Sequence, residues 1–222
     1  MGGLDDLLVV SLEQAVAAPF ASSRLADAGA RVIKIERPEG DFARKYDHVV
    51  NGNSAYFVWL NRGKESITMD LRKPEEIRLL LTMLQKADVL IQNFKTGALE
   101  KMGIRLPELR QKNPQLITCS ISGYGQDGPY QHMAGHDINY ISVAGALSIM
   151  GLRGGTPVIP YNLIADYAGG AMMATVGIMA AIIARQVNGK GQHVDISMTD
   201  GVLYLMANIV SRYFSDGEVP RP

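Results

Sequence analysis

Short apolar runs alternate with helical patterns through the first half of the chain. Buried strands are expected at residues 7–11, 31–36, 67–71, 88–92 and 115–121. Helical patterns lie between them, at residues 18–28, 74–86, 97–101 and 106–111. A strand, a crossover helix and a second strand place the two strands parallel. The alternation therefore predicts an α/β fold class built on a mostly parallel sheet.

The second half of the chain is patterned differently. A helical stretch at 137–150 precedes a Gly/Pro-rich connection at 151–160, and a long apolar helix is expected from Asp166 to about Gln186. Residues 192–197 alternate as a strand does, and 199–214 are helical in pattern. The uncharged run 168–184 has the minimum length of a membrane span, but it is rich in Gly and Ala, so we interpret it as a buried helix and expect no membrane partner.

Composition narrows the class of protein. The 222 residues are 47% apolar and 20% charged, which is typical of a globular protein of one domain or slightly more. The 22 basic and 22 acidic residues balance, which argues against nucleic acid or an anionic membrane as the partner. The single cysteine, Cys119, lies in an apolar run and is expected to be buried, and with no N-terminal signal pattern a cytoplasmic location is favoured.

Common cofactor motifs are missing from the sequence. The turn after the first strand, SLEQAVAAPF, contains no glycine, so the G-x-G-x-x-G fingerprint of dinucleotide-binding proteins is not formed. A Walker A loop is also lacking. The four histidines, His48, His132, His136 and His193, do not follow zinc-ligand spacing. We therefore expect no metal and no nicotinamide or flavin cofactor.

Two residues are the best candidates for chemistry, and each has a structural alternative. Asp166 precedes the apolar helix, so it is either a helix cap or a catalytic carboxylate beside free first-turn amides, with Gly169 and Gly170 admitting a substrate. His136 is either a hydrogen-bonded structural histidine or an acid/base, and the adjacent carboxylate of Asp137 would raise its basicity. The spacing leaves both alternatives open.

Five blocks follow one another along the chain: VIKIERPEGD at 32–41, LNRGKESITMDL at 60–71, VLIQNFKTGALEKMG at 89–103, SGYGQDGP at 122–129 and GKGQHVDISM at 189–198. In this order they resemble the family III coenzyme A transferases (the CaiB/BaiF family), which include the α-methylacyl-CoA racemases. The resemblance implies a Rossmann-like large domain over residues 1–198. Residues 199–222 would then be a helix and the start of a linker to a small domain that family members carry further along.

The resemblance also implies the roles of the residues around Asp166. In the transferases this aspartate is the nucleophile, and in the racemases it is an acid/base. The block around His136 and Asp137 is the racemase form, in which the histidine is the second acid/base. Asn162 would support Asp166. The racemases pair their histidine with a glutamate from a region that this chain does not include.

A coenzyme A site is implied by the same resemblance. Its residues would be Val16, Ala17, Arg37, Asn61, Lys64, Asn93, Phe94 and Lys101. Arg37, Lys64 and Lys101 would face the phosphates, and Phe94 the adenine. Lys101 stands where many transferases have arginine. A lysine there could not bind a phosphate through two parallel hydrogen bonds, as arginine does. The blocks near the N-terminus are instead closer to transferases of small dicarboxylic acids.

Three functions follow as expectations. The first is a racemase that inverts the α-carbon of a 2-methylacyl-CoA by two-base proton transfer. The second is a CoA transferase that works through an acyl anhydride on Asp166, and the third is a CoA-binding relative without catalysis. An acyl-CoA substrate is expected in each enzymatic case, with no cofactor beyond the coenzyme A it carries, and a homodimer is expected for the protein.

Overall fold

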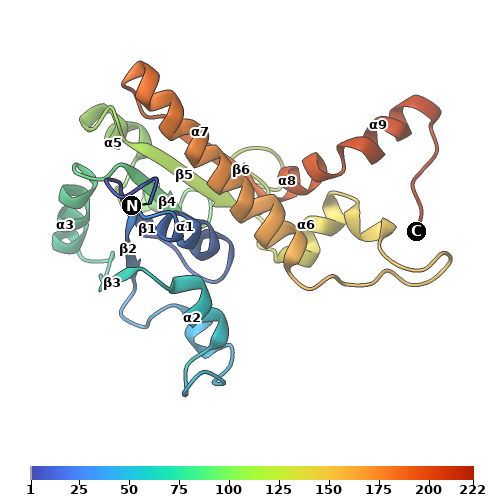
Figure 1. The fold of residues 1–222 in the computed structure, drawn as a ribbon, viewed down its shortest axis with the longest axis horizontal. Coiled ribbons are helices and arrows are strands. Elements are labelled where there is room, and N and C mark those ends of the chain that lie inside the picture. Colours follow the sequence, from blue (N-terminus) through green and yellow to red (C-terminus); the bar gives the residue numbers. More distant parts are fainter. Residues whose placement is uncertain (1) are drawn as a thin grey trace.

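A six-stranded, fully parallel sheet forms the centre of the molecule. The computed structural model describes residues 2–222 and shows the strand order β3-β2-β1-β4-β5-β6 (Figure 1). The strands are β1 (Leu8–Leu12), β2 (Arg31–Glu36), β3 (Glu65–Thr68), β4 (Val89–Gln92), β5 (Ile117–Ser122) and β6 (His193–Ser197). The predicted α/β class with a mostly parallel sheet is confirmed.

The connections reverse direction between β1 and β4. β1 pairs with β2 on one side, through Val10 opposite Ile33, and with β4 on the other, through Val10 opposite Leu90. Strands β2 and β3 extend the sheet one way, and β4, β5 and β6 extend it the other way. In open parallel sheets, ligands bind where the order reverses, beyond the carboxyl ends of the strands.

Helices cover both faces of the sheet. Their bounds are α1 (Ala17–Asp27), α2 (Ala55–Asn61), α3 (Pro74–Leu84), α4 (Ala98–Lys101), α5 (Leu106–Lys112), α6 (Asp137–Val143), α7 (Met173–Asn188), α8 (Met198–Leu205) and α9 (Ala207–Asp216). Two short 3₁₀ turns, η1 (Phe42–Lys45) and η2 (Ala146–Ile149), and a ten-residue π-helix, η3 (Leu163–Met172), complete the helical elements. One core joins α1, η3, α7 and α8 to the sheet, and the other joins α3, α4 and α5 to it. Cys119 is buried in the first core, as expected.

The long apolar helix begins earlier than the sequence pattern predicts. Its first part, η3, is a π-helix from Leu163, and α7 continues it to Asn188. Asp166 therefore lies inside the helix and is not its cap; the cap position belongs to Asn162. By length and composition, Leu163–Asn188 could cross a membrane, with a mean hydropathy of 1.7. One side of this helix packs in the core through residues such as Ala174 and Ile178.

Four other segments differ from their sequence patterns. The helix α2 was not expected, and the strand expected at 67–71 begins two residues earlier and ends at Thr68, as β3. The helix expected at 137–150 ends at Val143, because Gly145 adopts a φ of 86° and starts the separate turn η2. The helix expected at 199–214 divides at Met206 into α8 and α9, and α9 extends away from the sheet (Figure 1).

Candidate active site

A cavity of about 360 Å³, here called the central pocket, opens at the carboxyl ends of β1, β4 and β5. It brings together His136 and Asp166, which are far apart in sequence, and Val16 and Ala17 at the start of α1. Asn93 and Phe94, which follow β4, line the same cavity. Six of the predicted site residues therefore share one pocket at the point where the strand order reverses.

Asp166 is a mostly buried carboxyl with one side-chain partner. The Asn162 Nδ2 donates to Asp166 Oδ2 over 3.1 Å, one helical turn away. Burial raises the pKa of Asp166 to about 6; the Asn162 hydrogen bond and the charge of His136 oppose this rise, and Asp137 adds to it. A carboxyl with a pKa close to neutral can both accept and donate a proton under ordinary conditions.

Asp137 supports Asp166 through the backbone. It is buried, and its Oδ2 accepts hydrogen bonds of 2.7 Å from the amides of both Ala165 and Asp166. The expected pairing of Asp137 with the His136 imidazole is thus replaced by a bond between two segments that flank the pocket. Burial raises the pKa of Asp137, and the two amides oppose that rise.

The two hydrogen bonds to Asp137 correct the expectation that free amides at the start of this helix stabilise negative charge on a substrate. Two amides expected to be free for a substrate are occupied by Asp137, so the start of this helix cannot offer them to a thioester oxygen. Gly169 and Gly170 do not admit a substrate either. A Cβ on Gly169 would lie 2.9 Å from the Val202 amide, and one on Gly170 would lie 2.7 Å from Met198 Cγ. Both glycines serve the close packing of η3 on α8.

His136 caps α6 and presents an exposed side chain to the central pocket. Its backbone amide donates to Asn139 Oδ1 over 2.9 Å. The hydroxyl of Tyr140 donates to the Gly135 carbonyl over 2.5 Å, and a Cβ on Gly135 would lie 2.7 Å from the Tyr140 ring. Tyr140 therefore fixes the backbone just before His136. The sequence offered no signal for this role, because a tyrosine at that spacing is also a normal core residue.

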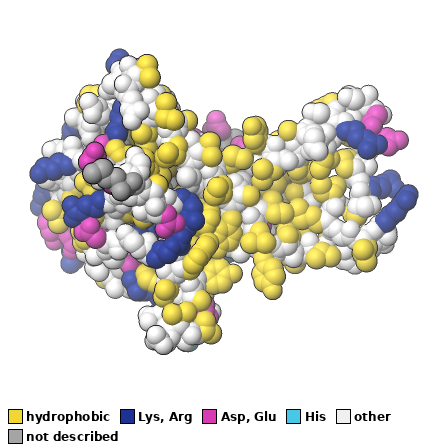
Figure 2. Space-filling model, in the orientation of Figure 1, with side chains coloured by type: hydrophobic (Ala, Val, Ile, Leu, Met, Phe, Trp, Pro, Cys, Tyr) yellow, Lys and Arg dark blue, Asp and Glu magenta, His cyan; other side chains and the backbone are white. Residues whose placement is uncertain are grey.

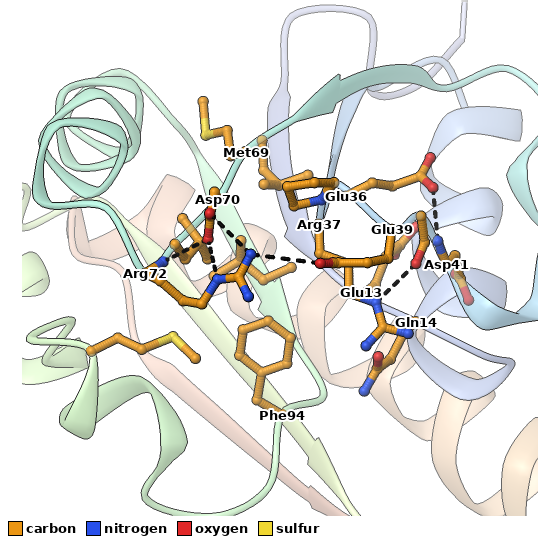
Figure 3. A pocket seen from close by; sticks show the side chains of 16 residues that line it. Glu13, Gln14, Glu36, Arg37, Glu39, Asp41, Met69, Asp70, Arg72 and Phe94 are labelled. Atoms are coloured by element: carbon orange, nitrogen blue, oxygen red, sulfur yellow. Dashed lines mark hydrogen bonds and ion pairs between the residues drawn. The ribbon is translucent and has the colours of Figure 1, made fainter.

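A second cavity of about 410 Å³, the outer pocket, adjoins the central pocket. Gln14 and Phe94 line both. Figure 3 shows the guanidinium groups of Arg37 and Arg72 on either side of the Phe94 ring. Arg37 Nε donates to the Gly40 carbonyl over 2.9 Å, and Arg72 forms an ion pair with Asp70 at 2.7 Å. Arg72 was not predicted, since nothing in the sequence distinguishes it from a solvated surface charge.

Three predicted coenzyme A residues lie elsewhere. Lys64 is buried, and its Nζ donates to Glu13, Pro19 and Asn61, which uses all three of its N–H groups. Burial lowers its pKa to about 8, opposed by Glu13. Asn61 accepts this bond inside the same buried network. The expectation that Lys64 faces a phosphate is wrong for this geometry. Lys101 is exposed on α4 and lies outside both pockets.

A parallel sheet with a mostly buried carboxyl and an imidazole in one pocket at its switch point defines the class: an α/β protein with two groups there that can exchange protons. Among proteins of known sequence, the family described as CoA-transferase family III matches residues 4–222. The chain belongs to CoA-transferase family III.

The names of individual relatives describe two kinds of activity, CoA transfer and racemisation. The chain is 38% identical to an acetyl-CoA:oxalate CoA-transferase of Acetobacter aceti over 99% of this chain and 57% of the relative. It is 39% identical to the α-methylacyl-CoA racemase of Homo sapiens over 91% of this chain and 50% of the relative. A crystal structure of a CAIB/BAIF family protein from Brucella suis superposes with a TM-score of 0.92 at 38% identity, covering 99% of this chain and 59% of that one. The chain thus spans little more than half the length of these relatives.

Proposed function

We propose that the protein is an acyl-CoA racemase that inverts the α-carbon of a 2-methylacyl-CoA. The observation that carries this proposal is the presence of His136 and Asp166 in one pocket, the first at the cap of α6 and the second in η3. Inversion needs one group to remove the α-proton and a second group to return a proton from the other face. A carboxyl and an imidazole that reach one cavity from different elements can supply these two groups.

The coenzyme A would extend from the central pocket into the outer pocket. Phe94 and Gln14 line both cavities, so a long substrate can occupy them together. Arg37 and Arg72 would meet its phosphates, although Arg72 must first leave Asp70. The N-terminus of α1, at Val16 and Ala17, would stabilise negative charge on the thioester oxygen, because helix N-termini favour anions.

Deuterium exchange tests the racemase. We expect the wild-type protein to exchange the α-proton of both enantiomers of a 2-methylacyl-CoA in deuterium oxide without an acyl acceptor. Asp166→Asn and His136→Gln should each lose exchange with one enantiomer more than with the other, because each residue serves one face. Wild-type protein that binds the thioester but exchanges neither enantiomer would contradict the proposal.

A CoA transferase is the second candidate. It is favoured by the match to the oxalate CoA-transferase along 99% of this chain and by the Asn162 bond that orients the Asp166 carboxylate. In that case the Asp166 carboxylate would attack the thioester carbonyl and expel the coenzyme A thiolate, and hydroxylamine would cleave the resulting acyl anhydride on Asp166 to a hydroxamate. Binding of acyl-CoA with neither exchange nor trapping would instead identify a non-catalytic relative.

We also propose that the protein is a homodimer. The support is a broad band of exposed hydrophobic side chains over α7 and its surroundings (Figure 2). Met172, Val176, Ile183 and Val187 lie on the exposed side of this long helix. Contiguous apolar surface of this extent is unusual on a monomer and is typical of an interface.

A further inference from the structure

The loop that joins β1 to α1 holds an unusual backbone conformation between the two pockets. Gln14 lines both pockets, and Ala15 lines the central one. Ala15 has a φ of 65°, in the left-handed region that disfavours a residue with a Cβ. Such a conformation persists only where surrounding groups impose it, and these cases cluster at functional sites.

Two side chains from neighbouring strands impose this conformation. Asp41, beyond β2, accepts from the Ala15 amide on Oδ1 over 3.1 Å. Asn93, beyond β4, exchanges two bonds with Gln14: its Oδ1 accepts from the Gln14 amide at 3.1 Å, and its Nδ2 donates to the Gln14 carbonyl at 2.9 Å. Because β2 and β4 flank β1, the loop is held from both sides.

Asp41 is itself fixed by buried charges. Its Oδ2 accepts from Lys34 Nζ over 2.7 Å, and its Oδ1 also accepts from the Ala43 amide over 2.9 Å. The side chains of Lys34, Asp41 and Glu13 are at most 1% exposed. Buried ion pairs of this kind are seldom more stabilising than apolar residues of similar size. Stability is therefore a poor explanation for charges placed beneath a strained loop.

We propose that Asp41 is a positioning residue, which holds the 13–16 loop so that the start of α1 faces the thioester in the central pocket. The proposal rests on the proposed function, since it assigns the substrate group that Val16 and Ala17 meet. Asp41 itself touches no reacting atom: it acts through the Ala15 amide. Lys34 supports this role, because its ammonium group fixes the orientation of the Asp41 carboxylate.

The structural test compares three variants with the wild-type protein in crystals. Asp41→Asn keeps the size of the side chain, but with its amide oxygen on the Lys34 ammonium its NH₂ group faces the amides of Ala15 and Ala43 and cannot accept from them. The double variant Lys34→Met with Asp41→Leu removes the buried pair and fills the space. Asp47→Asn is the matched control, because Asp47 also accepts two backbone amides, from Val49 and Ala55, but lines neither pocket. We expect the first two variants to move Ala15 out of the left-handed region and the control to keep it there.

Kinetics then separate positioning from stability. We expect kcat to fall by about 10- to 100-fold in Asp41→Asn and in the double variant, while KM changes by less than about threefold, since a small misplacement mainly affects the transition state. The double variant should have a Tm at or above that of the wild type. An unmoved loop in the double variant, or a displaced loop with wild-type kcat, would overturn the inference. Wild-type protein without turnover would refute the proposed function, and the crystal comparison would still decide whether Asp41 holds the loop.

Discussion

At the scale of single residues, the titration of Asp166 connects stability to chemistry. Its pKa is raised by burial from 3.8 to about 6 in the folded protein. The folded state therefore binds a proton more tightly than the unfolded state does between these two values. The contribution of Asp166 to stability is fully present below about pH 4, is lost as the pH rises to about 6, and is absent above that, where the buried carboxylate is charged.

Asp166→Asn should remove this cost while abolishing racemisation. We expect the variant to be more stable than the wild type at pH 7 by on the order of 2 kcal/mol, because no charge is buried. The gain should vanish near pH 4. Urea unfolding at a series of pH values measures it, and Asp6→Asn is the control, since Asp6 is exposed. A gain independent of pH would contradict the burial argument.

Tyr140→Phe tests whether the Tyr140 hydroxyl holds the backbone next to His136 in place. The variant loses the hydroxyl bond to the Gly135 carbonyl but keeps the ring that packs beside it. We expect a loss of about 1 kcal/mol in stability, the usual contribution of such a bond, and a several-fold lower kcat because His136 is less well placed. Tyr130→Phe is the control, as Tyr130 is exposed. Unchanged kcat with lower stability would limit Tyr140 to a structural role.

At the scale of elements, the contact between η3 and α8 holds Asp166 in place. Gly169 lies against the Val202 amide and the Met198 carbonyl, where a Cβ would come within 2.9 and 3.0 Å. Both neighbours are backbone atoms, so neither can rotate away. The three residues from Asp166 to Gly169 are less than one helical turn, so a displacement of η3 would move the carboxyl as well.

Gly169→Ala should therefore cost both stability and activity. We expect a destabilisation of about 2 to 3 kcal/mol, as for other overpacked sites, together with a lower kcat. Thermal unfolding and the deuterium exchange rate measure the two effects. Gly3→Ala is the matched control, because nothing lies within 4 Å of the added Cβ. Wild-type stability in Gly169→Ala would show that η3 and α8 can separate freely.

The sequence predicts the elements well where local pattern decides them. The strand at 31–36 lies where expected, and the order of strands and helices follows the pattern except for the unexpected α2 and the division of the last helix into α8 and α9. The start of the apolar helix was misplaced, because the carboxylate that caps Ala165 and Asp166 is Asp137, which is distant in sequence. Lys64 was misassigned for a similar reason: its burial depends on Glu13, 51 residues away. Periodicity cannot reveal such partners.

At the scale of the whole molecule, one side of α7 is apolar and exposed. Val176 is 60% exposed and Val187 is 85% exposed on a helix whose other side is fully buried at Ala174 and Ile178. Soluble monomers rarely carry so much apolar surface on one helix. A second copy of the chain is the partner proposed, because closed two-fold assemblies are the commonest oligomers.

Val176→Lys tests the homodimer at this scale. We expect the wild-type protein to sediment as a dimer and the variant to shift towards a monomer by at least about tenfold in dissociation constant, since a charge in an apolar contact must be desolvated. Val49→Lys is the control: Val49 is 77% exposed in the segment before α2, away from α7. Analytical ultracentrifugation separates the outcomes. A monomeric wild type would contradict the proposal and indicate that this side of α7 is covered by another part of a longer chain.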